Sequence, residues 1–158
     1  QMERQRTLHT LSRVYLALTE GHWTEQPRSG LIDRPIEKVP DCFNRYRIAD
    51  TGRPSRTEYK VLSEFNHENI PFSLVRLKLQ TGRTHQIRVH MASLSHPLLG
   101  DSIYGHEGFL GFDRAALHSF EITCQLPGHQ KTNVFSSEMP EDFQKVIVES
   151  QKPSSGLV

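Results

Sequence analysis

A change in the spacing of apolar residues between Ser73 and Leu94 constrains the fold of this chain more than any other feature. From Ser73 to Gln80, apolar and polar residues alternate, and the apolar ones are Val75, Leu77 and Leu79. Alternation of this kind is typical of a strand with one buried face. After Thr81-Gly82, the apolar residues recur at spacings of four and three, at Ile87, Met91 and Leu94. This second pattern predicts a helix from about Thr84 to Leu94 that Pro97 terminates.

Positive charge gathers in the same strand, turn and helix. No Asp or Glu occurs from Asn69 to Gly100, whereas the basic side chains of this window are Arg76, Lys78, Arg83 and Arg88. The predicted helix would also begin at Thr84, His85 and Gln86, beside free backbone N–H groups and the positive end of its dipole. This arrangement favours binding of a phosphate or a carboxylate, so we expect an anionic partner here.

The length and composition of the chain indicate one intracellular domain. Its 158 residues carry a formal net charge of +1, so the anionic partner is suggested by the clustering of charge and not by the total. Cys42 and Cys124 have neither a disulfide framework nor a zinc-binding pattern around them. No apolar run is long enough to span a bilayer, and we expect no membrane partner. We expect a domain over residues 1–150, a flexible tail or linker over 151–158, and a cytoplasmic location by default, with an organelle or the nucleus left open.

Other segments with regular spacing predict an α+β fold, a mainly antiparallel sheet with a few helices packed on it. The expected strands are Val14–Leu18, short ones near Gly30–Val39 and Tyr46–Ala49, Arg56–Phe65, His118–Leu126 and Asn133–Phe135. The strand from Arg56 should pair with the one that ends at Gln80, through a turn at Asn66–Asn69. A terminal helix is expected from about Pro140 to Glu149, because three apolar residues then share one side.

The arginines of the turn and helix have different expected roles. Arg83 and Arg88 are five residues apart, so they cannot both point at one atom from a regular helix. We assign Arg83 to the Thr-Gly-Arg turn, facing an anion, and Arg88 to the second helical turn, where its guanidinium can meet a buried carboxylate. The alternative is that both are ordinary solvated arginines. A further possibility, an enzyme that holds a small carboxylate substrate in this turn, has no motif behind it.

Several other polar residues have a structural interpretation by default. His85 and His90 are at spacing i, i+5 and would lie on different faces of a helix, so we expect no metal site there. We expect His118 to be a structural histidine and Tyr15 to be a core tyrosine with a satisfied hydroxyl. Asp101, between Gly and Ser, is expected to be a turn or cap residue.

The basic stretch closely resembles the signature of the RluA-type pseudouridine synthases, which isomerise uridine in ribosomal, transfer or other RNA. The matching residues are Leu79-Gln-Thr-Gly-Arg-Thr-His-Gln-Ile-Arg-Val-His-Met-Ala, then Leu-Ser-His-Pro-Leu-Leu-Gly-Asp101 and Tyr104-Gly105. Shorter similarities at residues 13–21, 57–62, 116–118 and 139–143 extend the resemblance across most of the chain. It implies a pseudouridine-synthase-like catalytic domain, an RNA partner, and no metal or other cofactor.

The resemblance also implies roles for individual residues. Arg88 is similar to the arginine that pairs with the family's catalytic aspartate, and Tyr15 to the tyrosine that stacks against the target base. The residues expected to bind RNA are Arg76, Lys78, Arg83, His85 and Gln86. In the implied reaction an ionised aspartate attacks the nucleoside, the uracil–sugar bond breaks, the base turns, and a carbon–carbon bond forms. The target uridine must leave the helical stack to reach such a pocket.

The family's nucleophile has no counterpart in this sequence. It lies in an Arg-Leu-Asp element followed by a Thr-Ser-Gly turn, upstream of the tyrosine strand, whereas the only acid before Tyr15 is Glu3. Asp33 and Asp113 lack the turn that should follow. We therefore expect this chain to be the C-terminal portion of a catalytic domain, incomplete at its N-terminal side and inactive alone. The alternative is a catalytically silent RNA-binding relative, and neither hypothesis requires an obligate protein partner.

Overall fold

A computed structural model describes residues 11–126 and 131–152 and has the α+β architecture that the sequence predicts. The strands of its larger sheet are, in spatial order, β2 (Ser29–Asp33), β5 (Arg56–His67), β6 (Ile70–Leu79), β1 (Ser12–Glu20), β7 (Leu117–Gln125) and β8 (Thr132–Ser136). The other elements are β3 (Ile36–Lys38), β4 (Tyr46–Ile48), α2 (Gln86–Ser93), the 3-10 turn η1 (Phe109–Gly111) and α3 (Glu141–Ser150). Every strand pair in the described residues is antiparallel.

The predicted hairpin of β5 and β6 lies between β2 and β1 in the sheet. Thr57 lies opposite Leu79 at one end and His67 opposite Ile70 at the other, so only two residues make the turn. Both of them, Glu68 and Asn69, have positive φ angles of 50° and 65°. A two-residue turn of this kind matches the right-handed twist of the strands it joins. Both strands therefore run longer than the sequence indicates.

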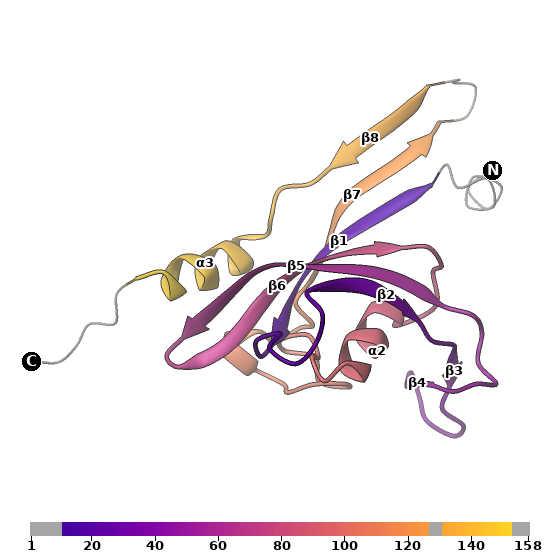
Figure 1. Cartoon of the computed structure of the whole chain (residues 1–158), viewed down its shortest axis with the longest axis horizontal. Helices are drawn as coiled ribbons and strands as arrows, with labels where there is room; N and C mark the ends of the chain where they lie inside the picture. The colour runs from indigo at the N-terminus through magenta and orange to yellow at the C-terminus, as the bar shows by residue number, and fades with distance from the viewer. Residues whose placement is uncertain (1–10, 127–130, 153–158) are drawn as a thin grey trace, which may run out of the picture.

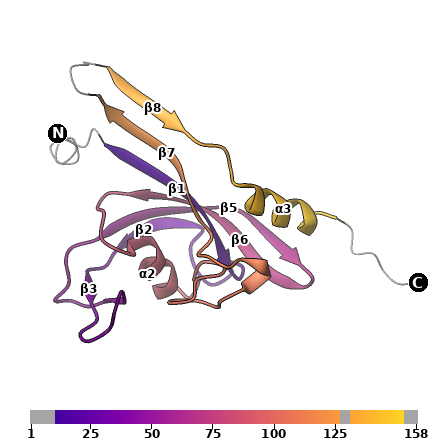
Figure 2. The same cartoon turned by 180° about the vertical axis from the view of Figure 1, so that it is seen from behind.

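The sheet separates two apolar layers, and α2 and α3 pack on opposite faces of it (Figures 1 and 2). The layer under α2 includes Ala17, Tyr59, Val75, Leu77, Leu79, Ile87 and Met91. The layer under α3 includes Leu16, Leu18, Phe72, Leu74, Phe143 and Val146. Successive residues of a strand point to opposite faces, so the alternation in β1 and β6 fills both layers at once. The predicted apolar sides of both helices are thereby confirmed.

Helix α2 begins two residues later than its apolar spacing indicates. His85, at its N-cap, has a left-handed conformation with φ 55° and ψ 16°, which a helix cannot continue. The turn before it is held by a hydrogen bond from the N–H of Gln86 to the carbonyl of Arg83 (3.1 Å). The helix ends at Ser93, and Ser95 again has a positive φ, so the chain turns before it reaches Pro97.

The small β3–β4 sheet lies beside α2, away from the β7–β8 hairpin that projects from the opposite side of the molecule (Figure 1). It is joined to the following segment by two backbone hydrogen bonds between Ile36 and Arg53, of 3.0 and 2.8 Å. Of the predicted tail, residues 153–158 lie outside the described part of the chain. None of the described helices is long and apolar enough to cross a membrane.

Candidate functional site

Most of the residues that the sequence singles out come together around one small cavity of about 210 Å³. It lies between β1, β6, the start of α2 and β7, and its lining residues are Tyr15, Leu79, Arg83, His85, Gln86, Ile87, Arg88 and Leu117. Five of these are residues for which the sequence implies a catalytic or RNA-binding role. They come from segments about seventy residues apart in sequence, and the antiparallel pairing of β1 with β6 is what places them side by side.

Tyr15 forms the apolar side of this small cavity. It lies on β1 opposite Leu77, on the face of the sheet that α2 covers, and it packs against the core without being fully buried. No hydrogen bond of its hydroxyl to another residue is found in the described part of the chain, and the partial exposure of Tyr15 leaves the hydroxyl open to water. A partly exposed aromatic ring between Leu79 and Leu117 offers a flat apolar surface to a planar ligand.

Arg88 occupies the polar side of the cavity and pairs with Asp101. Its Nε donates to Oδ2 of Asp101 at 2.7 Å and its Nη2 donates to Oδ1 at 2.6 Å, which is a bidentate pair. The expectation that Arg88 meets a buried carboxylate is thus confirmed, and the alternative of a solvated arginine is wrong for it. The carboxylate belongs to this chain, thirteen residues further on, and the sequence analysis assigned Asp101 only to a turn.

The electrostatics of this pair favour two charged groups. Burial opposes ionisation of Asp101, which is fully buried, but hydrogen bonds from Arg88 and from the N–H groups of Ile103 and Tyr104 outweigh it and lower the pKa of Asp101. The hydrogen bond to Asp101 raises the pKa of Arg88, against the effect of burial. Asp101 does therefore also serve as the turn residue that the sequence predicts, and it fixes the guanidinium in one orientation.

His85 joins Arg88 to two tyrosines. Because a guanidinium can only donate, Nε2 of His85 accepts from Nη1 of Arg88 at 3.1 Å. The proton of the neutral imidazole then lies on Nδ1 and points to the hydroxyl of Tyr104, 2.9 Å away. The same hydroxyl accepts the backbone N–H of Tyr46 at 2.9 Å. Burial and the charge of Arg88 lower the pKa of His85, while Asp101 opposes them, so the neutral form is favoured.

Gln86 is buried, and this corrects its predicted position on the RNA-facing surface. Its Oε1 accepts from the hydroxyl of Thr81 (2.8 Å) and from the N–H of Arg83 (3.0 Å). Its Nε2 donates to the carbonyl of Arg56 (3.0 Å) and to the hydroxyl of Thr57 (2.9 Å). All its hydrogen-bonding groups are thus directed inward. Gln86 holds the turn between β6 and α2 in place, and Arg83 with it.

Arg76 and Lys78 lie on the face of the sheet opposite the small cavity. They alternate along β6 with Val75, Leu77 and Leu79, which form the layer under α2, so their side chains point toward the layer under α3. The small cavity and these two side chains therefore lie on different faces of the sheet. A count of positive charges along the sequence cannot distinguish the two faces of a strand.

Two functional candidates were not identified from the sequence. Asp101 received only a turn role, because its partner is remote in sequence, and Tyr104 appeared only as part of the Tyr104-Gly105 pair. The ring of Tyr104 lies 5.1 Å from the guanidinium carbon of Arg88. A conspicuous signal was available, since Asp101 is the first acid after the long acid-free window. Within the described residues, no group of three or more His, Cys, Asp or Glu is arranged to hold a metal ion.

Comparison with known proteins assigns this chain to a family. The sequence profile of the family described as RNA pseudouridylate synthase matches residues 1–93, more than half of the chain. The chain belongs to the RNA pseudouridylate synthase family. Its curated relatives place it with the RluA-type enzymes, as the signature from Leu79 onward predicts.

Relatives of this chain include a protein named for the ribosomal large subunit. Ribosomal large subunit pseudouridine synthase D of Nitrosomonas europaea is 33% identical over 92% of the chain and 43% of the relative. An uncharacterised RNA pseudouridine synthase of Bacillus subtilis is 37% identical over 92% of the chain and 46% of the relative. The chain thus spans less than half the length of these relatives.

A solved structure also resembles this chain. Human RNA pseudouridylate synthase domain containing 1 superposes with a TM-score of 0.72 at 29% sequence identity, over 86% of the chain and 58% of the human protein. The α+β fold predicted from the sequence is accordingly that of a pseudouridine synthase.

Proposed function

We propose that residues 1–150 are the C-terminal portion of a catalytic domain that isomerises uridine to pseudouridine in RNA. The observation that carries this proposal is the small cavity that Tyr15 and Arg88 both line, with Arg88 held by Asp101. Its volume of about 210 Å³ suits a single planar base rather than a folded nucleic acid. The uridine would therefore have to leave the stack of its neighbours to enter.

Tyr15 and Arg88 have different roles in this proposal. The ring of Tyr15 stacks against the uracil and holds it while the uracil–sugar bond is broken and the base turns. Arg88 uses Nε and one N–H of Nη2 for Asp101 and one N–H of Nη1 for His85, so one N–H on each terminal nitrogen is left. Those two hydrogens can bind a second carboxylate and keep it ionised, as a nucleophile requires.

The nucleophile itself would come from outside these 158 residues. No Arg-Leu-Asp element occurs in the sequence, and the chain covers less than half of the relatives that it matches. We therefore propose that the chain is inactive alone and that the complete protein containing it supplies the aspartate beside Arg88. The absence of that element is also the observation that favours the second candidate, a catalytically silent module that binds RNA.

Release of tritium from RNA labelled at carbon 5 of uridine tests the two candidates. We expect release by the complete protein and none by the 158-residue chain. Replacement of Arg88 by Lys in the complete protein should abolish release, because an ammonium group cannot bind two carboxylates in a bidentate manner. Arg28→Gln is the matched control, since this exposed arginine pairs with Glu64 and lies outside the cavity.

The outcomes separate the hypotheses. Release by the isolated chain would refute the proposal that the nucleophile lies elsewhere. A complete protein that binds RNA without releasing tritium from any cellular RNA would favour the silent module. Arg88→Lys must be shown by circular dichroism to be folded at the assay temperature, because the pair with Asp101 also contributes to stability.

A further inference from the structure

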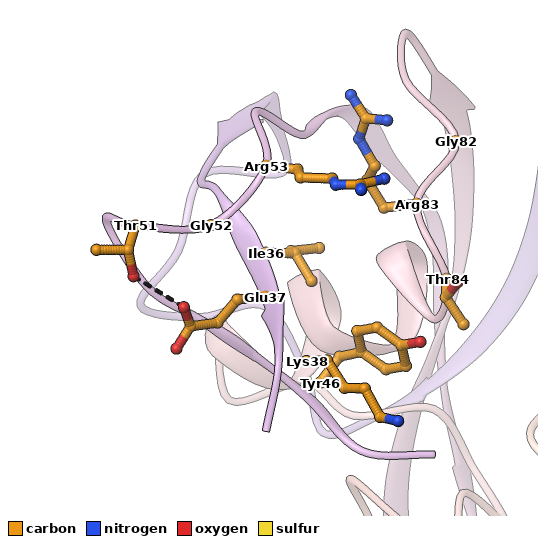
Figure 3. A pocket seen from close by; sticks show the side chains of 10 residues that line it. All are labelled: Ile36, Glu37, Lys38, Tyr46, Thr51, Gly52, Arg53, Gly82, Arg83 and Thr84. Atoms are coloured by element: carbon orange, nitrogen blue, oxygen red, sulfur yellow. Dashed lines mark hydrogen bonds between the residues drawn. The ribbon is translucent and has the colours of Figure 1, made fainter. Parts of the chain in front are cut away.

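A second, larger cavity adjoins the small one on the side of the β3–β4 sheet (Figure 3). Its volume is about 500 Å³, within the range of sites for small organic ligands. It is lined by Ile36, Glu37, Lys38, Tyr46, Thr51, Gly52, Arg53, Gly82, Arg83 and Thr84. These residues come from β3, β4, the segment after β4 and the turn before α2. Of these residues, Arg83 also lines the small cavity, and the function proposed above gives no role to the others.

Three cations reach this large cavity without a carboxylate partner. In the described residues, Lys38, Arg53 and Arg83 take part in no ion pair. The acid in the lining is Glu37, and it is already engaged by Arg47 at 2.8 Å and by the hydroxyl of Thr51 at 2.8 Å. Figure 3 shows Glu37 turned toward Thr51, away from the two arginines. The cavity therefore has a net positive charge that the protein does not neutralise.

Hydrogen bonds to the backbone position both arginines of the large cavity. The N–H and carbonyl of Arg53 both bond to Ile36, and Nε of Arg83 donates to the carbonyl of Pro54 at 3.3 Å. Gly52 allows this close approach, because a Cβ there would lie 2.6 Å from the backbone carbon of Ile36. Arg53 and Arg83 both line this cavity, and both are among the side chains drawn in Figure 3. Two positive charges on the wall of one cavity favour an anion inside it.

The large and small cavities are connected through one shared residue and one ring contact. Arg83 lines both of them. Tyr46, in the large cavity, meets His85, in the small one, edge to face with ring centroids 5.5 Å apart. A polymer that places one unit in the small cavity would thus bring its adjacent unit to Arg53 and Tyr46.

We propose that the large cavity holds the nucleotide adjacent to the target uridine, with its phosphate between Arg53 and Arg83. This inference rests on the proposed function and extends it by a second nucleotide site. Guanidinium groups match the geometry of phosphate oxygens and bind them with two hydrogen bonds each. Lys38 adds a third positive charge that attracts the RNA backbone, and Tyr46 offers the ring against which the ribose or base of this nucleotide packs.

The test measures binding of short single-stranded RNA to the complete protein that contains this chain. One RNA contains a single uridine, and two others carry a neutral methylphosphonate in place of the phosphate on its 5′ or its 3′ side. With normal RNA, Arg53→Gln should weaken binding about tenfold, the loss expected for one charge-assisted hydrogen-bonded contact. The slope of log K against log salt should become shallower by about 0.7. Arg28→Gln should change neither quantity.

The decisive result is that the effects of the protein substitution and of the RNA modification on binding are not additive. One of the two methylphosphonates should weaken binding to the wild type about tenfold and should cost the Arg53→Gln variant almost nothing further, because the contact is already lost. Independent losses at both positions, or wild-type affinity of Arg53→Gln, would overturn the second nucleotide site and leave the proposed function intact. Failure of the wild type to bind any of the three RNAs would overturn both proposals. Lys38→Gln, also at an exposed residue, repeats the test if Arg53→Gln proves unstable.

Discussion

Replacement of Asp101 by Asn tests whether the buried ion pair holds the site together. The substitution keeps the shape of the side chain and an oxygen for the N–H groups of Ile103 and Tyr104, but it removes the charge that Arg88 faces. Asp101 is fully buried and the side chain of Arg88 is 18% exposed, so water cannot replace the lost carboxylate. Removing one partner of a buried pair typically costs about 3–5 kcal/mol. Partial access of Arg88 to water places the expected loss near 3 kcal/mol.

Urea denaturation measured by circular dichroism gives the free energy of unfolding for this comparison. Asp33→Asn is the matched control, because Asp33 forms an ion pair with Arg56 in which both side chains are about half exposed. Exposed pairs contribute little, so the control should unfold with the wild type.

A double-mutant cycle completes the argument. Arg88→Met should also destabilise the protein, since it leaves Asp101 buried without its cation, but the double variant should lose much less than the sum of the two. A loss below about 1 kcal/mol for Asp101→Asn, or strict additivity in the cycle, would refute the view that this pair is a buried and coupled unit.

Three further outcomes are expected. Gln86→Leu should lower the free energy of unfolding by about 2 kcal/mol in the same assay, because it leaves buried polar groups of the turn without partners. An unchanged free energy of unfolding would contradict the view that Gln86 holds the turn between β6 and α2 in place. Burial lowers the pKa of His90 from the ordinary value of 6.5. As the pH falls, the unfolded chain therefore binds a proton at this residue before the folded protein does. The free energy of unfolding should decline as the pH falls below 6.5, and it should decline less steeply in the His90→Gln variant. Neutralising Arg76 and Lys78 together should leave RNA affinity within about twofold, whereas Arg83→Gln should weaken it about tenfold, as gel-shift titrations would show.

Much of the fold follows from the sequence because local periodicity has a local cause. The change of period at Thr81-Gly82 predicted a strand, a turn and a helix, and β6 and α2 are in those places. The ends of elements were less accurate. The left-handed conformation of His85 delays α2, and its side chain contacts Arg88 and Tyr104, neither of which the spacing of apolar residues reports.

The sequence by itself determined the family, the strand–turn–helix and most of the residues that meet in the small cavity. These features depend on short motifs and on the spacing of side chains along one segment. Only the tertiary structure decided that Arg88 binds Asp101, that Gln86 faces inward, and that Arg76 lies on the opposite face of the sheet. Each of these depends on where a distant segment passes. The pairing of strands and the packing of α2 on them fix the position of that segment. The residues next to it in sequence do not.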